Sequence, residues 1–223
     1  MKYFLFVCSL CCVILSSCVS TYFKTPNDVY KTPATIYLVD GTEKTGDLTV
    51  QFETGFDYDY SVNLYHKETR NTEKISFQNI KYYKVNNDYY YPKQVDVRLD
   101  GKLYLLFVKR LTPENSKIQL FELERSYKTA ATAQSDKLYF IAPPKSGQYE
   151  VWSIYGKNLF PDFEYKMSSL VADCSVLAEK IKSKQNGYYI ASASFSSNEK
   201  KVDVFKKIIA EYDTCNYQIG NKQ

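Results

Sequence analysis

The chain has 223 residues and a formal net charge of +4, with 44% hydrophobic and 24% charged residues. These values are typical of a globular protein and exclude a disordered or collagen-like chain. Six cysteines are too few for a disulfide scaffold, and the weak positive charge favours no nucleic-acid partner. The unusual feature is an excess of aromatic residues, with 22 Tyr and 13 Phe against one Trp.

Residues 1–17 have the pattern of a lipoprotein signal peptide. Met1-Lys2 is a short positive start, and an apolar run from Tyr3 to Leu15 follows it. The run is shorter than the roughly 20 apolar residues that a transmembrane helix needs. Leu15-Ser-Ser-Cys18 looks like a bacterial lipobox, in which small residues precede the cut and the Cys18 thiolate takes a diacylglyceryl group. The alternatives are a plain signal peptide with a chance cysteine, or a buried core helix.

Use of the lipobox would leave a mature chain of 206 residues, from Cys18 to Gln223. Stable anchoring needs two or more acyl chains, which a lipidated N-terminal cysteine carries. Residues 18–33 are then a tether between the membrane and the folded part. Because no acidic run follows Cys18, we expect a lipid-anchored location in the cell envelope, facing the periplasm.

The remaining cysteines predict one disulfide. Cys8, Cys11 and Cys12 leave with the signal peptide and Cys18 is assigned to lipid, so Cys174 and Cys215 remain. Two cysteines in an oxidising compartment favour a disulfide, which would close a loop of about 40 residues and contribute about 4 kcal/mol. The competing hypothesis is a nucleophile or metal pair, but it needs histidine partners and the single histidine, His66, is distant in sequence.

A period of two dominates residues 34–156, which we expect to form an antiparallel β-rich domain. Ile36 and Leu38 alternate with Thr35 and Tyr37, and the turn residues Asp40-Gly41 follow. Leu103 to Leu111 is almost continuously apolar, which favours a strand that is buried on both faces or partly covered by a helix. Further strands are expected around residues 48–52, 62–64, 75–83, 89–91, 118–123, 137–142 and 150–155.

Residues 157–223 have a helical period instead. Apolar stripes run through Met167, Leu170 and Val171, through Val176, Leu177 and Ile181, and through Val202, Phe205, Ile208, Ile209 and Tyr212. Ser196 and Glu199 have capping-box spacing. Strands followed by helices predict an α+β fold: an antiparallel β-rich body, sandwich or barrel-like, followed by a small C-terminal helical cap. The Cys174–Cys215 bond would join two of the cap's helices.

The sequence offers no catalytic constellation, so we expect no enzyme, no cofactor and no metal site. His66 lies at a strand end without a nucleophile in a strained context, and no G-x-S-x-G or glycine-rich phosphate loop occurs. Asp57 and Asp59 point the same way from a strand and would suit calcium or a carboxylate hydrolase. A solvated strand face explains them more simply.

The candidate binding surface is a tyrosine cluster around one turn, formed by Tyr82, Tyr83, Tyr89, Tyr90 and Tyr91. A tyrosine ring is apolar and its hydroxyl is polar, so the residue suits protein interfaces and sugar faces. It also suits ordinary half-buried strands. Three interpretations stay open here: packing, which is favoured, a protein interface, and a glycan or small-ligand platform.

The layout resembles exported lipoproteins of Bacteroidota that have no assigned activity. The resemblance rests on the lipobox and on Ile36-Tyr-Leu-Val-Asp-Gly41, Lys74-Ile-Ser-Phe-Gln-Asn-Ile-Lys81, Leu106-Phe-Val-Lys-Arg-Leu111, Ile118-Gln-Leu-Phe-Glu122 and Tyr212-Asp-Thr-Cys215. It covers most of the mature chain and implies no catalytic residue. We therefore expect a non-enzymatic, membrane-anchored envelope lipoprotein with a structural or protein-interaction role, with a glycan or small-ligand binding lipoprotein as the alternative.

Overall fold

The computed structural model describes residues 29–52, 60–96, 101–128, 133–191 and 198–215. Within these residues the chain folds into one antiparallel sheet of ten strands, in the order β10-β9-β8-β7-β6-β5-β1-β2-β3-β4, and three helices toward the C-terminus. The predicted α+β fold with a β-rich body is confirmed. A sandwich or barrel is not confirmed, because the sheet is not closed.

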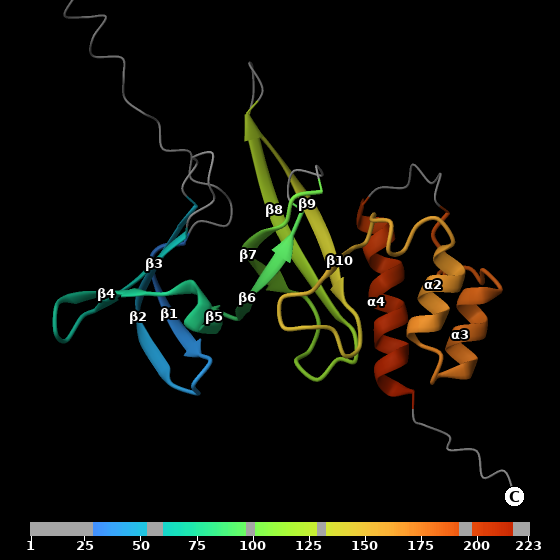
Figure 1. The fold of residues 1–223 in the computed structure, drawn as a ribbon, viewed down its shortest axis with the longest axis horizontal. Helices are drawn as coiled ribbons and strands as arrows, with labels where there is room; N and C mark the ends of the chain where they lie inside the picture. Colours follow the sequence, from blue (N-terminus) through green and yellow to red (C-terminus); the bar gives the residue numbers. More distant parts are fainter. Residues whose placement is uncertain (1–28, 53–59, 97–100, 129–132, 192–197, 216–223) are drawn as a thin grey trace, which may run out of the picture.

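The strand and helix bounds follow the predicted pattern in most places. The elements are β1 (Val29–Leu38), β2 (Glu43–Phe52), β3 (Tyr60–His66), β4 (Asn71–Ile75), the 3₁₀ helix η1 (Phe77–Asn79), β5 (Ile80–Val85), β6 (Asp88–Val95), β7 (Tyr104–Arg110), β8 (Gln119–Lys128), β9 (Ala133–Ala142), β10 (Trp152–Ser153), α2 (Phe163–Leu170), α3 (Ser175–Lys182) and α4 (Asn198–Thr214). Along the longest axis of the molecule, β1 to β5 lie at one end, β6 to β9 in the middle and the helices at the other end (Figure 1).

Two expected boundaries are corrected. β1 begins at Val29, so residues 29–33 of the expected tether belong to the sheet. A bulge between Val29 and Thr32, with Lys31 at a φ of 45°, interrupts the alternation there and hides the strand in the sequence. The single strand expected over residues 75–83 is divided into β4 and β5 by η1, whose turn is closed by the Asn79 N–H donating to the Ser76 carbonyl oxygen.

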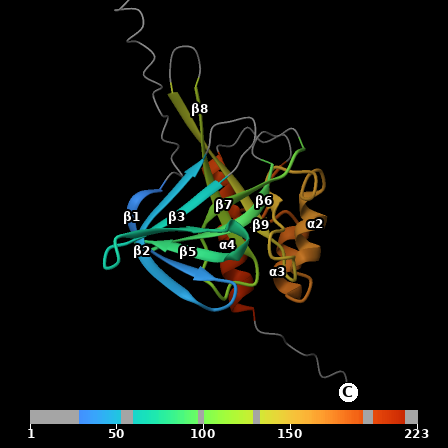
Figure 2. The same ribbon diagram turned by 60° about the vertical axis from the view of Figure 1, so that its left-hand side comes forward.

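The short link η1 forces the first half of the sheet to curl. β4 and β5 are neighbours in sequence but lie at opposite ends of the five-strand order β5-β1-β2-β3-β4. Four strand spacings in a flat sheet would span about 19 Å, whereas a link built on one 3₁₀ turn covers roughly half of that. The five strands therefore curve toward one another, and Figure 2 shows this curvature in β1.

Three apolar clusters hold the layers together. The curl cluster lies inside the curled strands; the ribbon cluster joins β6 and β7 to β8 and β9; the helix cluster joins β8 to β10 with the helices. The curl cluster contains Ile36, Leu48, Val50, Val62, Leu64, Ile75, Ile80, Tyr83, Val85 and Phe107. The ribbon cluster contains Val95, Tyr104, Leu106, Val108, Phe121, Leu123, Leu138, Phe140 and Ala142. The helix cluster is the largest and includes Leu120, Ile141, Phe163, Leu177, Phe205 and Ile208.

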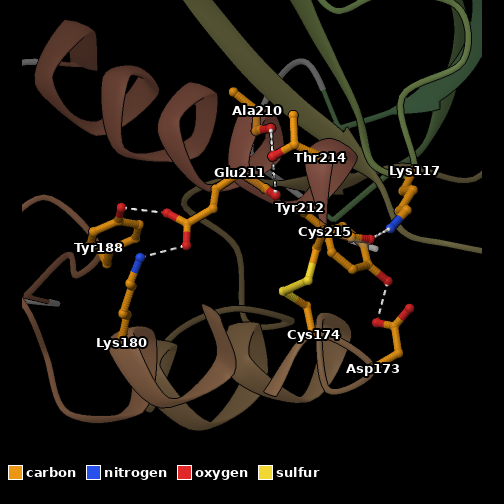
Figure 3. Close-up of a disulfide and its surroundings, with 10 residues drawn as sticks. All are labelled: Lys117, Asp173, Cys174, Lys180, Tyr188, Ala210, Glu211, Tyr212, Thr214 and Cys215. Atoms are coloured by element: carbon orange, nitrogen blue, oxygen red, sulfur yellow. Dashed lines mark hydrogen bonds and ion pairs between the residues drawn. A yellow bond between two sulfur atoms is a disulfide. The ribbon is translucent and has the colours of Figure 1, made fainter. Parts of the chain in front are cut away.

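The helical cap is fastened at the end of α4, as Figure 3 shows. The sulfur atoms of Cys174, before α3, and Cys215, after α4, are 2.02 Å apart, as the sequence predicted for a disulfide. The Tyr212 hydroxyl donates to Asp173 Oδ1 at 2.6 Å, which adds a second link between the same two regions. The backbone N–H of Lys117 donates to Asp213 Oδ1 at 2.8 Å, so the α4 end also holds the β7–β8 loop.

The close passage of β3 over β2 predicts that Gly46→Ala destabilises the fold. An added Cβ at Gly46 would lie 2.6 Å from the Tyr65 carbonyl oxygen, which is backbone and cannot move independently of the sheet. We expect a loss of about 1–3 kcal/mol in the free energy of unfolding, measured by thermal unfolding. The matched control is Gly147→Ala, whose nearest atoms lie at 4.0 Å. Equal melting temperatures for the two variants would contradict the prediction.

Candidate functional site

The candidate surface is a set of four tyrosines on one face of three neighbouring strands, here called the tyrosine row: Tyr37, Tyr82, Tyr89 and Tyr91. Tyr37 in β1 pairs directly with Tyr82 in β5, and their rings stack at 4.4 Å between centroids. Tyr82 also stacks on Tyr91 of β6 at 5.0 Å and lies 5.9 Å from Tyr89. The side chains of the row are half-buried. Aromatic pairs of this kind contribute about 0.5–1.5 kcal/mol each beyond their burial.

Arg110 at the end of β7 closes the row on one side. Its guanidinium lies 5.0 Å from the ring centroid of Tyr89 and 4.8 Å from that of Tyr91, within cation–π range. Its Nη1 donates to the Tyr91 hydroxyl at 2.5 Å. The rings and the hydroxyl together fix the plane of the guanidinium.

Burial and nearby carboxylates raise the pKa values of two tyrosines in the row. Burial, chiefly, raises the pKa of Tyr91 to about 12, while Arg110 opposes the rise. Burial also raises the pKa of Tyr82, and the nearby carboxylates of Glu114 and Glu43 add to that rise. Glu114 lies in the β7–β8 loop, so this loop flanks the row.

The five tyrosines of the candidate surface do not share a face. Tyr83 and Tyr90 point to the opposite side of the sheet, because neighbouring side chains alternate along a strand. Tyr83 is 1% exposed in the curl cluster, where it stacks on Tyr90 at 4.9 Å and meets Phe107 edge-on at 4.8 Å. Tyr83 is thus part of the core, and the half-buried Tyr90 packs against the same cluster. Only Tyr82, Tyr89 and Tyr91 remain candidates for a surface.

Two residues of the site were missed by the sequence analysis. Tyr37 belongs to the first hairpin and Arg110 follows the apolar run of β7, so neither is close to the tyrosine turn in sequence. The β1–β5 ladder brings Tyr37 beside Tyr82. The alternation did signal that Tyr37 lies opposite the apolar face of its strand, but no local pattern predicts which strand lies next to β1.

A polar cavity of about 820 Å³ adjoins the row, at the end of the curled strands. Lys84 lines this cavity, and its Nζ also lies 5.4 Å from the Tyr89 ring centroid, so it connects the cavity with the row. The other lining residues are Pro33, Ala34, Thr35, Glu43, Lys44, Thr45, Gly46, Asp47, His66, Lys67, Glu68, Thr69, Glu73 and Asn86.

Ion pairs occupy much of the cavity wall. Glu73 receives the Lys44 amine on one oxygen and His66 Nε2 on the other, the latter at 3.1 Å. The hydrogen bonds from Lys44 and then from His66 hold the pKa of Glu73 below its usual range. Lys67 pairs with Asp47 at 3.0 Å. His66 is therefore a half-buried partner of a carboxylate.

A buried amine holds the segment after β9 against β6. Lys93 is 8% exposed, and its Nζ donates to the Gln148 carbonyl oxygen at 2.6 Å while lying 5.0 Å from the Phe121 ring centroid. Burial lowers the pKa of this amine to about 8. The backbone N–H of Gln94 adds a bond to the Tyr149 carbonyl oxygen at 2.9 Å. The contacts of Lys93 are explained by this structural role.

Several predicted residues lie outside the described part of the chain, namely Cys18, Asp57, Asp59 and Ser196. Among the described residues, no group of three His, Cys, Asp or Glu side chains has an arrangement that could hold a metal ion. None of the helices in the described ranges combines the length and the apolar character needed to cross a bilayer.

Comparison of the chain with protein-family models, with curated proteins and with solved structures finds no match. The site is therefore interpreted from its own geometry.

The raised tyrosine pKa values predict a loss of stability in alkali. Burial raises the pKa of Tyr91 and of Tyr139 to about 12, above the value of about 10 in an unfolded chain. The contribution to stability is complete below pH 10 and is lost as the pH rises through 12. Absorbance at the tyrosinate band should show a late phase in the native protein that is missing in denaturant. Tyr91→Phe should reduce this late phase, and an unchanged phase would contradict the assignment.

Proposed function

We propose that this protein is a lipid-anchored protein of the bacterial cell envelope that binds a partner protein through the tyrosine row. The N-terminal lipobox supports the anchor, and the arrangement of the row supports the binding. On this proposal the protein is not an enzyme and needs no cofactor. The β-rich body presents the row, and the tether from Cys18 connects that body to the membrane.

The observation that carries the proposal is that the rings of the row already contact one another and two cations. Tyr82 has Tyr37 and Tyr91 as stacking partners, and Tyr89 has two cations against its ring. The row therefore offers ring edges, hydroxyl groups and charged side chains. A sugar that stacks its C–H face needs an open ring face, whereas edges, hydroxyls and cations are what protein interfaces commonly use. The geometry thus favours a protein partner over the glycan alternative.

Lipid attachment is tested by Cys18→Ser. The serine oxygen cannot replace the thiolate as acceptor of the diacylglyceryl group, so the variant should incorporate no labelled fatty acid. With its lipid lost, it should also leave the membrane fraction. The double variant Cys174→Ser, Cys215→Ser is the control, because it removes the two cysteines of the disulfide, which lie far from the lipobox in sequence, and should keep the lipid. Membrane retention and labelling of Cys18→Ser would contradict the anchor.

Partner binding is tested by a photo-crosslinking amino acid at Tyr37, at the β1 end of the row. Irradiation of whole cells should give one discrete crosslinked protein species. The same amino acid at Tyr165, which is 58% exposed on α2, is the matched control and should not give that species. The species should weaken when Arg110 is also changed to Gln. A product that resists protease and is degraded by glycosidases would favour the glycan alternative instead.

A further inference from the structure

Two cations lie against the ring of Tyr89, and among the described residues neither has a carboxylate partner. The Arg110 guanidinium is 5.0 Å and the Lys84 amine 5.4 Å from the ring centroid. In the described part of the chain neither side chain forms a salt bridge. Three other half-buried lysines, Lys44, Lys109 and Lys180, each pair with a carboxylate. Two positive charges therefore lie beside the Tyr89 ring without an ionic partner in the described ranges.

The guanidinium of Arg110 has hydrogen-bond donors that could bind an anion. Of the five N–H donors of a guanidinium, one is directed to the Tyr91 hydroxyl. The contacts with the Tyr89 and Tyr91 rings hold the guanidinium in place and, within the residues that the structure describes, leave its other donors free for a ligand. A carboxylate can accept two parallel N–H bonds from such a fork, and a charge-assisted pair of this kind is roughly twice as strong as a neutral hydrogen bond. Because Arg110 and Lys84 are both half-buried, water screens the attraction less than at a fully exposed site.

The charges around the row are not symmetrical. Glu43 lies opposite Tyr37 in the β1–β2 ladder, at the far end from Arg110. Glu43 and Glu114 are both close enough to raise the pKa of Tyr82. An acidic group is thus disfavoured beside Tyr37. Lys84 in β5 and Arg110 in β7 flank Tyr89 of β6, so a bound anion would meet two cations there, and Glu114 is a carboxylate that also acts on Tyr91.

We propose that the tyrosine row binds an extended acidic segment of the partner protein, with an Asp or Glu carboxylate of that segment seated on Arg110 and Lys84 above Tyr89. This inference rests on the proposed function and specifies the chemistry of the partner. The row crosses three adjacent strands, so an extended chain lying along it reaches the uncharged rings as well as the cations. The adjoining cavity is a weaker candidate for this role, since Lys44 and Lys67 in its wall already have carboxylate partners.

The test uses the mature chain and two labelled synthetic peptides of equal length. One peptide alternates Glu with Ser, and the other has Gln in place of every Glu. Fluorescence anisotropy should show the Glu peptide binding about tenfold tighter than the Gln peptide at low salt, with the difference shrinking at high salt. Arg110→Gln and Lys84→Gln should each weaken the Glu peptide several-fold.

Two control variants keep the test independent of folding and of net charge. Lys182→Gln removes the same charge from an exposed position on α3 and should leave binding unchanged. Arg110→Lys keeps the charge but loses the planar fork, so it should weaken the Glu peptide while its melting temperature stays near that of the parent. Equal effects of Arg110→Gln and Lys182→Gln would overturn the proposal.

Competition experiments distinguish a carboxylate site from a phosphate site. The crosslinking experiment distinguishes partner binding as such from binding of an acidic segment. Acetate should displace the Glu peptide at least as well as inorganic phosphate does. Displacement by phosphate alone would replace the carboxylate assignment by a phosphate site. A discrete crosslink at Tyr37 without binding of the Glu peptide would overturn the acidic segment and leave partner binding standing. If neither the crosslink nor binding of the Glu peptide is observed, both partner binding and the acidic segment are overturned.

Discussion

The alternation of side chains along β5 to β8 is the constraint on which the rest of the structure depends. Neighbouring residues of these strands enter different apolar clusters, so one strand contributes to two layers at once. In β7, Phe107 joins the curl cluster while Leu106 and Val108 join the ribbon cluster. In β8, Leu120 joins the helix cluster while Phe121 joins the ribbon cluster. A slip of one residue in register would exchange the contents of adjacent clusters, which explains why each ladder must be fixed along its length.

The helical cap reaches the tyrosine row through the β7–β8 loop. This loop carries Glu114, which acts on the row, and Lys117, whose backbone N–H and amine bind Asp213 and the Cys215 carbonyl oxygen. The Cys174–Cys215 pair joins the same end of α4 to α3. The cap is therefore not an independent addition to the sheet. Its last helical turn fixes the loop that borders the candidate binding surface.

The sequence predicted the features that local patterns determine. The period of two located most strands, the continuous apolar run marked β7 as a strand buried on both faces or partly covered by a helix, and the helical stripes located α2, α3 and α4. The Cys174–Cys215 disulfide was predicted because the other four cysteines were assigned to the signal peptide and the lipid. The five tyrosines Tyr82, Tyr83, Tyr89, Tyr90 and Tyr91 were grouped as one candidate surface with packing favoured, although the alternation along each strand already separates neighbouring tyrosines onto two faces.

Non-local pairing explains what the sequence could not predict. Tyr37 and Arg110 complete the row because β1 pairs with β5 and β6 with β7. These ladders join segments of the chain that no local period relates. The start of β1 was hidden by a bulge, and the division between β4 and β5 by a single 3₁₀ turn. For the two ladders the deciding interaction lies across the sheet, where spacing along the chain carries no information.

The charge distribution of the row gives a physical reason to assign binding to this part of the fold. Two like charges beside one ring repel each other, and each is partly removed from water, so their arrangement costs free energy in the isolated protein. The ring faces of Tyr89 and Tyr91 offset part of that cost through cation–π attraction, which contributes about 0.5–2 kcal/mol per contact. An arriving carboxylate would remove the repulsion and use donors that are already oriented. Because the rings and the ladders have ordered the site beforehand, little further ordering entropy would oppose that step.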